Sequence, residues 1–116
     1  IINRGGGNLI IELYNSNEKE QFSDHPFKVK IDGVIQIVLP GGTIILKPGE
    51  SICLEQGIYH RFYGQPKKGK VFVGEVSAVN DDTSDNCFFQ PVGRFPEIIE
   101  DEKPLHLLTS DYSKYI

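Results

Sequence analysis

The 116-residue chain contains no methionine and no tryptophan, and it has only two cysteines, Cys53 and Cys87. Two cysteines do not form the disulfide framework that small secreted domains use, so the sequence indicates a reducing, cytoplasmic compartment. Because an open reading frame begins with methionine, its absence leads us to expect further residues upstream of Ile1.

The chain also lacks an excess of positive charge and a long apolar run. Its 12 Lys and Arg stand against 16 Asp and Glu, which gives a formal net charge of −4. No basic stripe of the kind that binds nucleic acid is visible. The apolar runs are too short to cross a bilayer, and no signal peptide is present. We therefore expect neither nucleic acid nor a membrane as a partner.

Short apolar runs, separated by glycine and proline, make up most of the chain. Strands that recur every eight to ten residues are typical of an antiparallel sandwich or barrel, so we expect an all-β fold. Asp32-Gly33 lies between two alternating runs and predicts a two-residue hairpin, because glycine tolerates the positive φ of a type I′ turn. The predicted strands are Asn8–Tyr14, Phe27–Ile31, Val34–Leu39, Thr43–Leu46, Ser51–Leu54, Tyr59–Tyr63 and Lys70–Val76.

The length predicts one domain over residues 1–116. We expect its β core at about 1–90 and a C-terminal arm at about 91–116. This arm is acidic, with Glu97, Glu100, Asp101 and Glu102 close together. No stretch before residue 96 shows a sustained helical repeat, and the arm itself is predicted to be irregular or extended, or a short helix.

The stretch GESICLEQGIYHRFYG, from Gly49 to Gly64, contains a glycine and a histidine at an informative spacing. It resembles the second conserved motif of the cupins, although Glu55 replaces a preferred proline and Gly64 a preferred asparagine. The resemblance implies a cupin double-stranded β-helix, or jelly-roll barrel, with His60 on an inward face as a metal ligand. A neutral imidazole suits a borderline divalent metal. The alternative is a half-buried barrel histidine that bonds to a neighbour.

One histidine does not complete a metal site, because a divalent ion needs three or four protein ligands. We expect His25, in a turn, and His106, in the arm, to be exposed. The opening run of three glycines suggests where the other ligands lie. If Gly6 closes the first cupin motif, the remaining ligands are expected upstream of Ile1.

Four blocks of sequence resemble the D-lyxose isomerase family in order and separation, from Ile1 to about Tyr112. They read IINRGGGNL, GIYHRFYG, GKVFVGEVSAVNDDTSDN and PVGRFPEIIEDE. The resemblance implies an intramolecular oxidoreductase that interconverts D-lyxose and D-xylulose, and also D-mannose and D-fructose, through an enediol. It further implies a divalent metal cofactor, with Mn²⁺ as the favoured ion. The implied substrate is a monosaccharide, and the implied assembly is a homodimer.

Two other functions remain open. One is a non-catalytic sugar-binding or structural cupin. The other is a cupin phosphosugar isomerase, which needs a basic phosphate cradle. The sequence shows no basic cluster for such a cradle beyond Lys67, Lys68 and Lys70, and these three residues are interpreted as a turn.

Aldose–ketose isomerisation needs a Lewis acid and a base that moves a proton between adjacent carbons. The candidate catalytic carboxylates are Glu75, in an otherwise apolar run, and Glu97, and Arg94 is the candidate substrate-binding residue. A charge in an apolar strand is costly unless it faces a polar cavity or has a partner. The alternatives are a surface carboxylate for Glu75 and a surface ion pair between Arg94 and Glu97.

Aromatic residues flank His60 on both sides. We expect Tyr59 and Phe62 to face away from His60 and to pack in the barrel wall. Phe88 and Phe89 are also interpreted as packing residues rather than as a platform for a sugar. Asp81, Asp82 and Asp85 indicate a solvated loop, in which they cap turns.

Overall fold

A computed structural model describes residues 1–81, 84–90, 98–99 and 101–116. The prediction of a mainly β fold is confirmed, since all the regular structure before residue 75 is strand. The strands are β1 (Ile2–Gly6), β2 (Leu9–Asn15), β3 (Phe27–Ile31), β4 (Val34–Val38), β5 (Gly42–Leu46), β6 (Ile52–Cys53), β7 (Ile58–Gly64) and β8 (Val71–Gly74). A 3₁₀ turn, η1 (Thr109–Asp111), and a short helix, α1 (Tyr112–Tyr115), follow near the C-terminus.

The seven predicted strands correspond to β2 through β8, with ends that differ by up to two residues. The prediction failed to separate β1 as a strand of its own. Gly5 and Gly6 lie in β1, and glycine has a low strand propensity, so no sequence signal marked it. β1 pairs with β8, and its register shifts between Asn3 and Gly5, as at a β-bulge.

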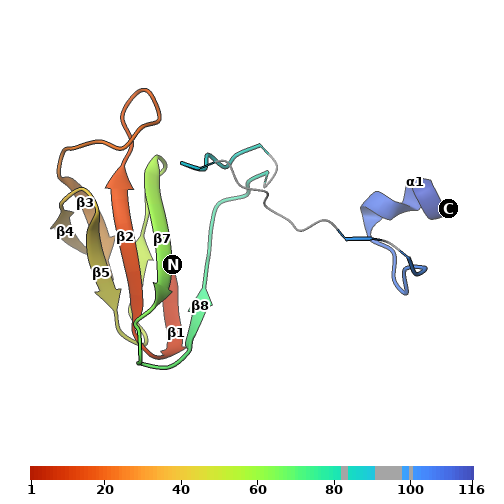
Figure 1. Cartoon of the computed structure of the whole chain (residues 1–116), viewed down its shortest axis with the longest axis horizontal. Helices are drawn as coiled ribbons and strands as arrows, with labels where there is room; N and C mark the ends of the chain where they lie inside the picture. Colours follow the sequence, from red (N-terminus) through yellow and green to blue (C-terminus); the bar gives the residue numbers. More distant parts are fainter. Residues whose placement is uncertain (82–83, 91–97, 100) are drawn as a thin grey trace.

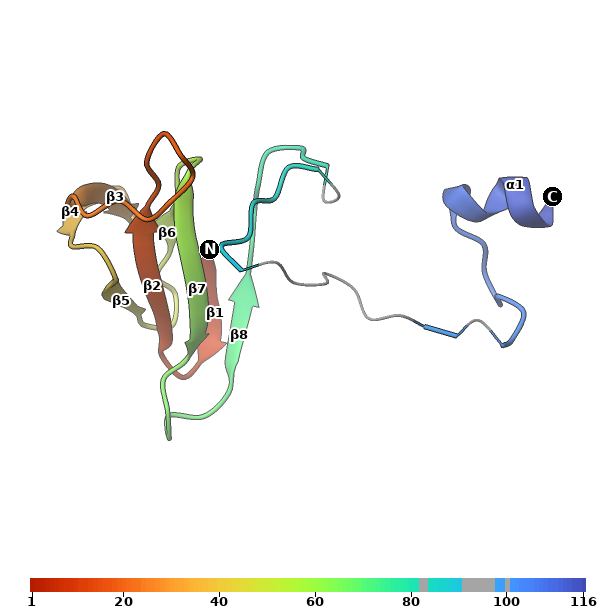
Figure 2. The ribbon, with the colours of Figure 1, turned by 45° about the horizontal axis from the view of Figure 1, so that its top comes forward.

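The strands form two facing layers (Figures 1 and 2). One sheet has the order β5-β2-β7 and the other has the order β4-β3-β6. The β1-β8 pair connects to the second sheet through a bridge between Ile2 and Ser51. All the pairings within these sheets are antiparallel.

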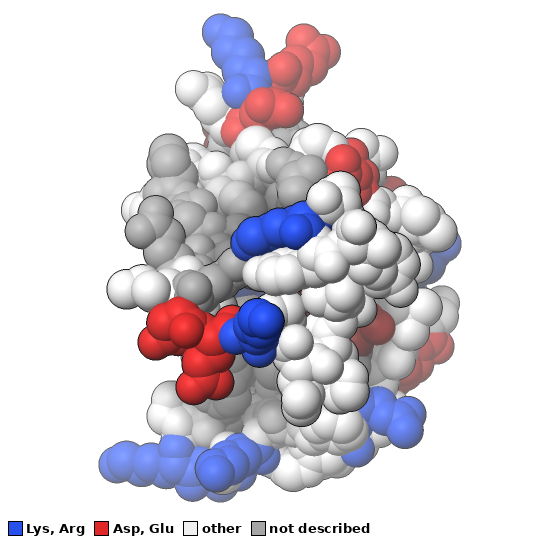
Figure 3. Space-filling model, turned by 90° about the vertical axis from the view of Figure 1, so that its right-hand side faces the viewer, with Lys and Arg blue, Asp and Glu red and all other residues white. Residues whose placement is uncertain are grey.

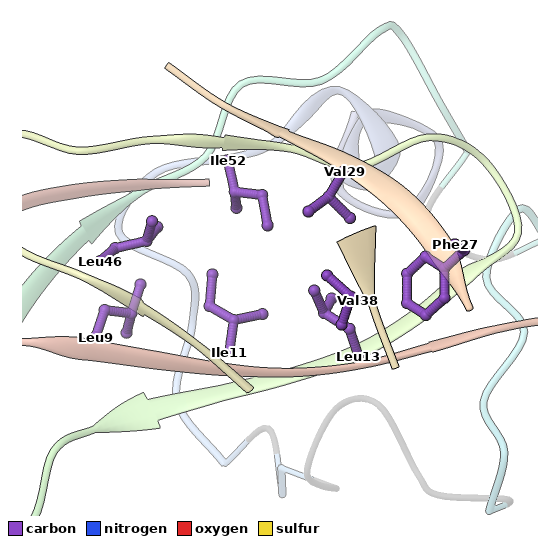
Figure 4. Packing of buried hydrophobic residues seen from close by; sticks show 8 residues of the cluster. All are labelled: Leu9, Ile11, Leu13, Phe27, Val29, Val38, Leu46 and Ile52. Atoms are coloured by element: carbon purple, nitrogen blue, oxygen red, sulfur yellow. The ribbon is translucent and has the colours of Figure 1, made fainter. Parts of the chain in front are cut away.

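The core lies between the two layers (Figure 4). Every second residue of β2 points inward, because side chains alternate between the two faces of a strand. These inward side chains meet residues of the other sheet in a buried apolar cluster. The cluster consists of Leu9, Ile11, Leu13, Phe27, Val29, Val38, Leu46 and Ile52.

The hairpin predicted at Asp32-Gly33 is confirmed. Its two residues have φ values of 47° and 81°, and the flanking residues Ile31 and Val34 are paired. Positive φ at both central positions is the signature of a type I′ turn, whose twist matches that of the strands it joins. The local sequence is therefore enough to set the register of β3 against β4.

Asn3 is a buried polar residue of β1 that ties three segments together. Its side-chain amide donates to the carbonyl oxygens of Leu46 and Gly7, each at 2.9 Å, and its side-chain oxygen accepts from the Gly5 amide at 3.1 Å. A buried amide is stable only when it is hydrogen-bonded. These bonds fix the glycine-rich start of the chain against the end of β5.

Gly6 occupies a position that no other residue fits. Its φ is +87°, and a Cβ atom there would overlap the backbone carbonyl oxygen of Lys70. We expect Gly6→Ala to lower the free energy of unfolding by about 2 kcal/mol, because it adds both backbone strain and overlap. Chemical denaturation measures this change. Gly64→Ala is the control, since a Cβ there meets its nearest atom at an ordinary 3.4 Å. Equal stability of the two variants would contradict the prediction.

The C-terminal arm lies apart from the two sheets, and both views show α1 well separated from the strands (Figures 1 and 2). The expectation of an irregular or short-helical tail agrees with η1 and α1. In the part of the chain that the structure describes, no helix is long and apolar enough to span a membrane. Figure 3, viewed from the side of the arm, shows acidic and basic side chains interspersed.

Candidate functional site

His60 lies in β7, directly opposite Leu13 of β2. Directly opposite residues of an antiparallel pair share a face of the sheet, so His60 is on the face that carries the core. β7 is nevertheless an edge strand of the sheet β5-β2-β7, and the side chain of His60 is exposed. The imidazole therefore belongs to the inner face and remains accessible from outside.

One ring nitrogen of His60 is already engaged. Nδ1 lies 3.1 Å from the carbonyl oxygen of Ile58. Because a carbonyl oxygen can only accept, Nδ1 carries the proton in this bond, and the neutral ring then presents the lone pair of Nε2. This is the form in which histidine ligates a metal or accepts a proton. The alternative interpretation of His60 was a half-buried histidine that bonds to a neighbour. The hydrogen bond to Ile58 is present, but the ring is exposed.

The prediction that Phe62 faces away from His60 is wrong. Phe62 is opposite Ile11, and His60 is opposite Leu13. Residues two apart in a strand point to the same side, so Phe62 and His60 share the inner face. Phe62 is 38% exposed, and it forms an apolar neighbour on the face that carries the histidine. Tyr59 does lie on the opposite face, as predicted, because it is adjacent to His60 in the strand.

The opposite face of β2 and β7 carries an aromatic clasp formed by Tyr14, Phe22, Tyr59 and Phe89. Phe22 stacks on Tyr14 with a centroid distance of 4.1 Å and on Phe89 with one of 3.9 Å. Tyr59 meets Phe22 edge-on at 5.3 Å and Phe89 edge-on at 6.0 Å. The packing role expected of Phe89 is confirmed. Sequence reasoning missed Phe22, because it lies in a loop with no periodic pattern around it.

Hydrogen bonds at Tyr59 hold the same clasp. The Tyr59 hydroxyl donates to the carbonyl oxygen of Glu20 at 2.7 Å and lies 3.3 Å from Cys87 Sγ. The hydrogen bond with Cys87, desolvation and the electrostatic influence of Cys87 and Glu20 raise the pKa of Tyr59 to about 12. Tyr59 therefore remains neutral at physiological pH and is no candidate for the base. Its contacts with Cys87 and Phe89 link the 84–90 segment to β7.

The other predicted site residues are placed only in part. Glu75 follows the last residue of β8 and is exposed. His60 therefore belongs to the sheet β5-β2-β7, whereas Glu75 lies just beyond β8, a strand of the separate β1-β8 pair. Arg94 and Glu97 lie outside the described residues, as does Asp82. The exposure expected of His25 and His106 is confirmed, and His25 pairs with Asp24 at 3.2 Å.

A divalent metal does not fit the described residues on their own. Within residues 1–81, 84–90, 98–99 and 101–116, no group of three or more His, Cys, Asp or Glu side chains could hold one. Apart from His25 and His106, which are exposed elsewhere, these residues offer one imidazole, that of His60, whereas a zinc-like site takes three or four protein ligands. The prediction that further ligands lie upstream of Ile1 stays a prediction.

A hollow of about 450 Å³ opens along β3 and the turn between β6 and β7. Neither His60 nor Glu75 lines it. β6 pairs only with Lys30 and Ile31, so the first half of β3 borders the hollow without a strand beside it on that side. The lining residues are Asn15, Phe27, Lys28, Val29, Lys30, Ile35, Cys53, Glu55, Gln56 and Ile58.

Comparison with known proteins connects this sequence to an enzyme family. A family model described as D-lyxose isomerase matches residues 1–112. The D-lyxose/D-mannose isomerase of Serratia proteamaculans is 49% identical over 116 residues, which are 100% of this chain and 51% of the relative. The protein of the same name from Escherichia coli O157:H7 is 50% identical over 115 residues, which are 99% of this chain and 51% of the relative.

The chain spans about half the length of these curated relatives. The match nevertheless covers the whole chain. Because the family model also matches residues 1–112, this chain belongs to the D-lyxose isomerase family.

Proposed function

We propose that this protein is an aldose–ketose isomerase that interconverts D-lyxose and D-xylulose, and D-mannose and D-fructose, through an enediol. The observation that carries the proposal is the family match over residues 1–112, with relatives named D-lyxose/D-mannose isomerase about half identical across the chain. The accessible imidazole of His60 on the inner face supports it, because this group can bind a polar ligand beside an apolar surface.

The reaction needs one group to bind the sugar oxygens and another to move the proton between C2 and C1. We assign the first task to His60 and Arg94. Glu75 and Glu97 are the two candidates for the base, since a carboxylate can take the C2 proton and return it at C1. The exposure of Glu75 at the end of β8 leaves its carboxylate accessible to a ligand.

A divalent metal cofactor is also part of the proposal, with Mn²⁺ as the favoured ion. His60 would be one of its ligands, and further ligands would have to come from residues that the structure does not describe. The proposed fold is the cupin jelly-roll barrel, which two facing antiparallel layers support. The proposed compartment is the cytoplasm, in keeping with two free, exposed cysteines, and the proposed assembly is a homodimer.

Direct assay tests the function. We expect the protein, supplied with Mn²⁺, to convert D-lyxose to D-xylulose and D-mannose to D-fructose, with deuterium from heavy water appearing in the ketose. Incorporation of solvent deuterium is expected because the base takes the C2 proton, can exchange it with the solvent, and then returns a proton or deuteron at C1. D-mannose 6-phosphate is the control, and we expect it to react poorly. No ketose from either free sugar, at full metal content, would overturn the proposal.

A second candidate is a non-catalytic sugar-binding cupin. It is favoured by one observation, namely that the described residues hold no three-ligand metal group. The same assay separates the two candidates when it is combined with calorimetric titration of D-lyxose. Binding of D-lyxose without ketose formation would favour the second candidate.

A further inference from the structure

The connection from β2 to β3 begins with a compact loop that its own hydrogen bonds hold in shape. Ser16 and Phe22 form a bridge across it, and the Asn17 amide donates to the carbonyl oxygen of Gln21 at 2.9 Å. The side-chain oxygen of Asn17 accepts from two further amides of the loop, at 2.9 and 3.0 Å. An asparagine side chain fixes a turn in this way because it bonds to backbone just ahead of it. We call residues 16–22 the 16–22 loop.

The 16–22 loop contacts β7 close to His60. The Tyr59 hydroxyl donates to the carbonyl oxygen of Glu20 at 2.7 Å, and the ring of Phe22 meets the Tyr59 ring edge-on at 5.3 Å. In both ribbon views the loop after β2 lies at the end of the sheet where β7 begins (Figures 1 and 2). The loop therefore holds the Tyr59 side chain by one hydrogen bond and one ring contact.

Glu20 presents its carbonyl oxygen to Tyr59 from a strained backbone conformation. Its φ is +57°, in the left-handed region that residues other than glycine rarely adopt. Its amide donates to the carbonyl oxygen of Asn17 at 3.0 Å. Strain of this kind persists only where surrounding contacts hold it, and it is common beside functional sites. The loop is thus constrained at the residue that bonds to Tyr59.

Tyr59 lies between His60 and the hydrogen-bond acceptor of His60. Nδ1 of His60 is 3.1 Å from the carbonyl oxygen of Ile58, so the backbone that joins donor and acceptor passes through Tyr59. A rotation of that backbone would change the direction of the imidazole and of its Nε2 lone pair. Successive side chains of a strand point to opposite faces, so the loop holds Tyr59 from the face that does not carry the imidazole.

We propose that Tyr59 and the 16–22 loop position His60. By fixing the backbone at Tyr59, they keep the imidazole in the Nδ1–H form and leave the Nε2 lone pair available to the sugar. The inference rests on the isomerase function proposed above and adds to it residues that act through His60. Tyr59 and Asn17 are the positioning residues, the first by its hydroxyl and the second by the shape of the loop.

Two variants test this positioning. Tyr59→Phe removes the hydroxyl and keeps the ring, and Asn17→Ala removes the side-chain oxygen that shapes the loop. Ring ¹⁵N NMR before Mn²⁺ is added, at about pH 9 where imidazole is neutral, reports which nitrogen of His60 carries the proton. The His60 signals are those that disappear in His60→Ala. We expect the wild type to be mainly in the Nδ1–H form and both variants to gain the Nε2–H form.

The kinetic effect is measured on the same proteins with Mn²⁺ and D-lyxose. We expect kcat/KM to fall about tenfold in Tyr59→Phe and in Asn17→Ala, since a displacement of about 1 Å at a reacting group can cost about 100-fold. Tyr63→Phe is the matched control, because it removes a hydroxyl from the same face of β7 near the other end of the strand. Asn17→Asp keeps the side-chain oxygen and should retain both the NMR signature and the activity.

The two measurements separate the positioning from the isomerase function. A wild type without the Nδ1–H form, or the same NMR signature in the wild type, Tyr59→Phe and Asn17→Ala, would overturn the positioning whatever the activity. A changed signature with an unchanged kcat/KM would show that the orientation of the ring does not matter to the reaction. A wild type that is inactive on both sugars overturns the proposed function, while the NMR comparison still decides whether the loop orients His60.

Discussion

Replacing His60 with alanine is expected to lower kcat/KM for D-lyxose by about 100-fold or more, a typical loss when a group acting directly on the reaction is removed. The imidazole lies on the inner face opposite Leu13, and its bond to the Ile58 carbonyl orients the ring with the Nε2 lone pair available. Alanine removes that lone pair, and no neighbouring residue in β7 supplies another imidazole.

The same substitution should leave stability almost unchanged. Because His60 is exposed, its loss is expected to change the free energy of unfolding by no more than about 0.5 kcal/mol. Steady-state kinetics, metal content and thermal unfolding are measured together on each variant. His25→Ala is the matched control, since His25 is 84% exposed beside Asp24 and should keep full activity. Full activity in His60→Ala would refute its assignment to the site.

Replacing Ile11 with alanine is expected to lower the free energy of unfolding by about 4 kcal/mol. Ile11 is fully buried in the middle of β2 and is paired on its two sides with Ile44 and Phe62. Truncation removes three buried carbon atoms and leaves a cavity between the sheets. The closely packed side chains around it cannot move in to fill the cavity without strain. Such a loss is a large part of the stability of a small domain.

Urea denaturation measures the effect of Ile11→Ala as a shift in the midpoint at an unchanged slope. The control is Ile45→Ala, which makes the same chemical change in β5 at a side chain that is 51% exposed. It should cost less than about 1 kcal/mol. Equal losses in the two variants would show that Ile11 does not lie in the core described above.

Local sequence determined β2 to β8 and one of the turns of this protein, but not β1. Alternation of apolar and polar residues marked β3 correctly to the residue, because side chains of a strand alternate between two environments. Asp32-Gly33 fixed its hairpin through backbone preferences that involve only two residues. The same local spacing identified His60 as a candidate site residue, and the register later placed it on the inner face.

Tertiary structure alone decided which strands are neighbours. β2 pairs with β5 and with β7, which are distant in sequence. Their register placed both His60 and Phe62 on the inner face, opposite Leu13 and Ile11. Tertiary packing also brought Phe22 and Phe89 together in the aromatic clasp, although 66 residues lie between them. Such contacts depend on loop closure and on the mutual fit of many side chains, and neither leaves a periodic signal in a short stretch of sequence.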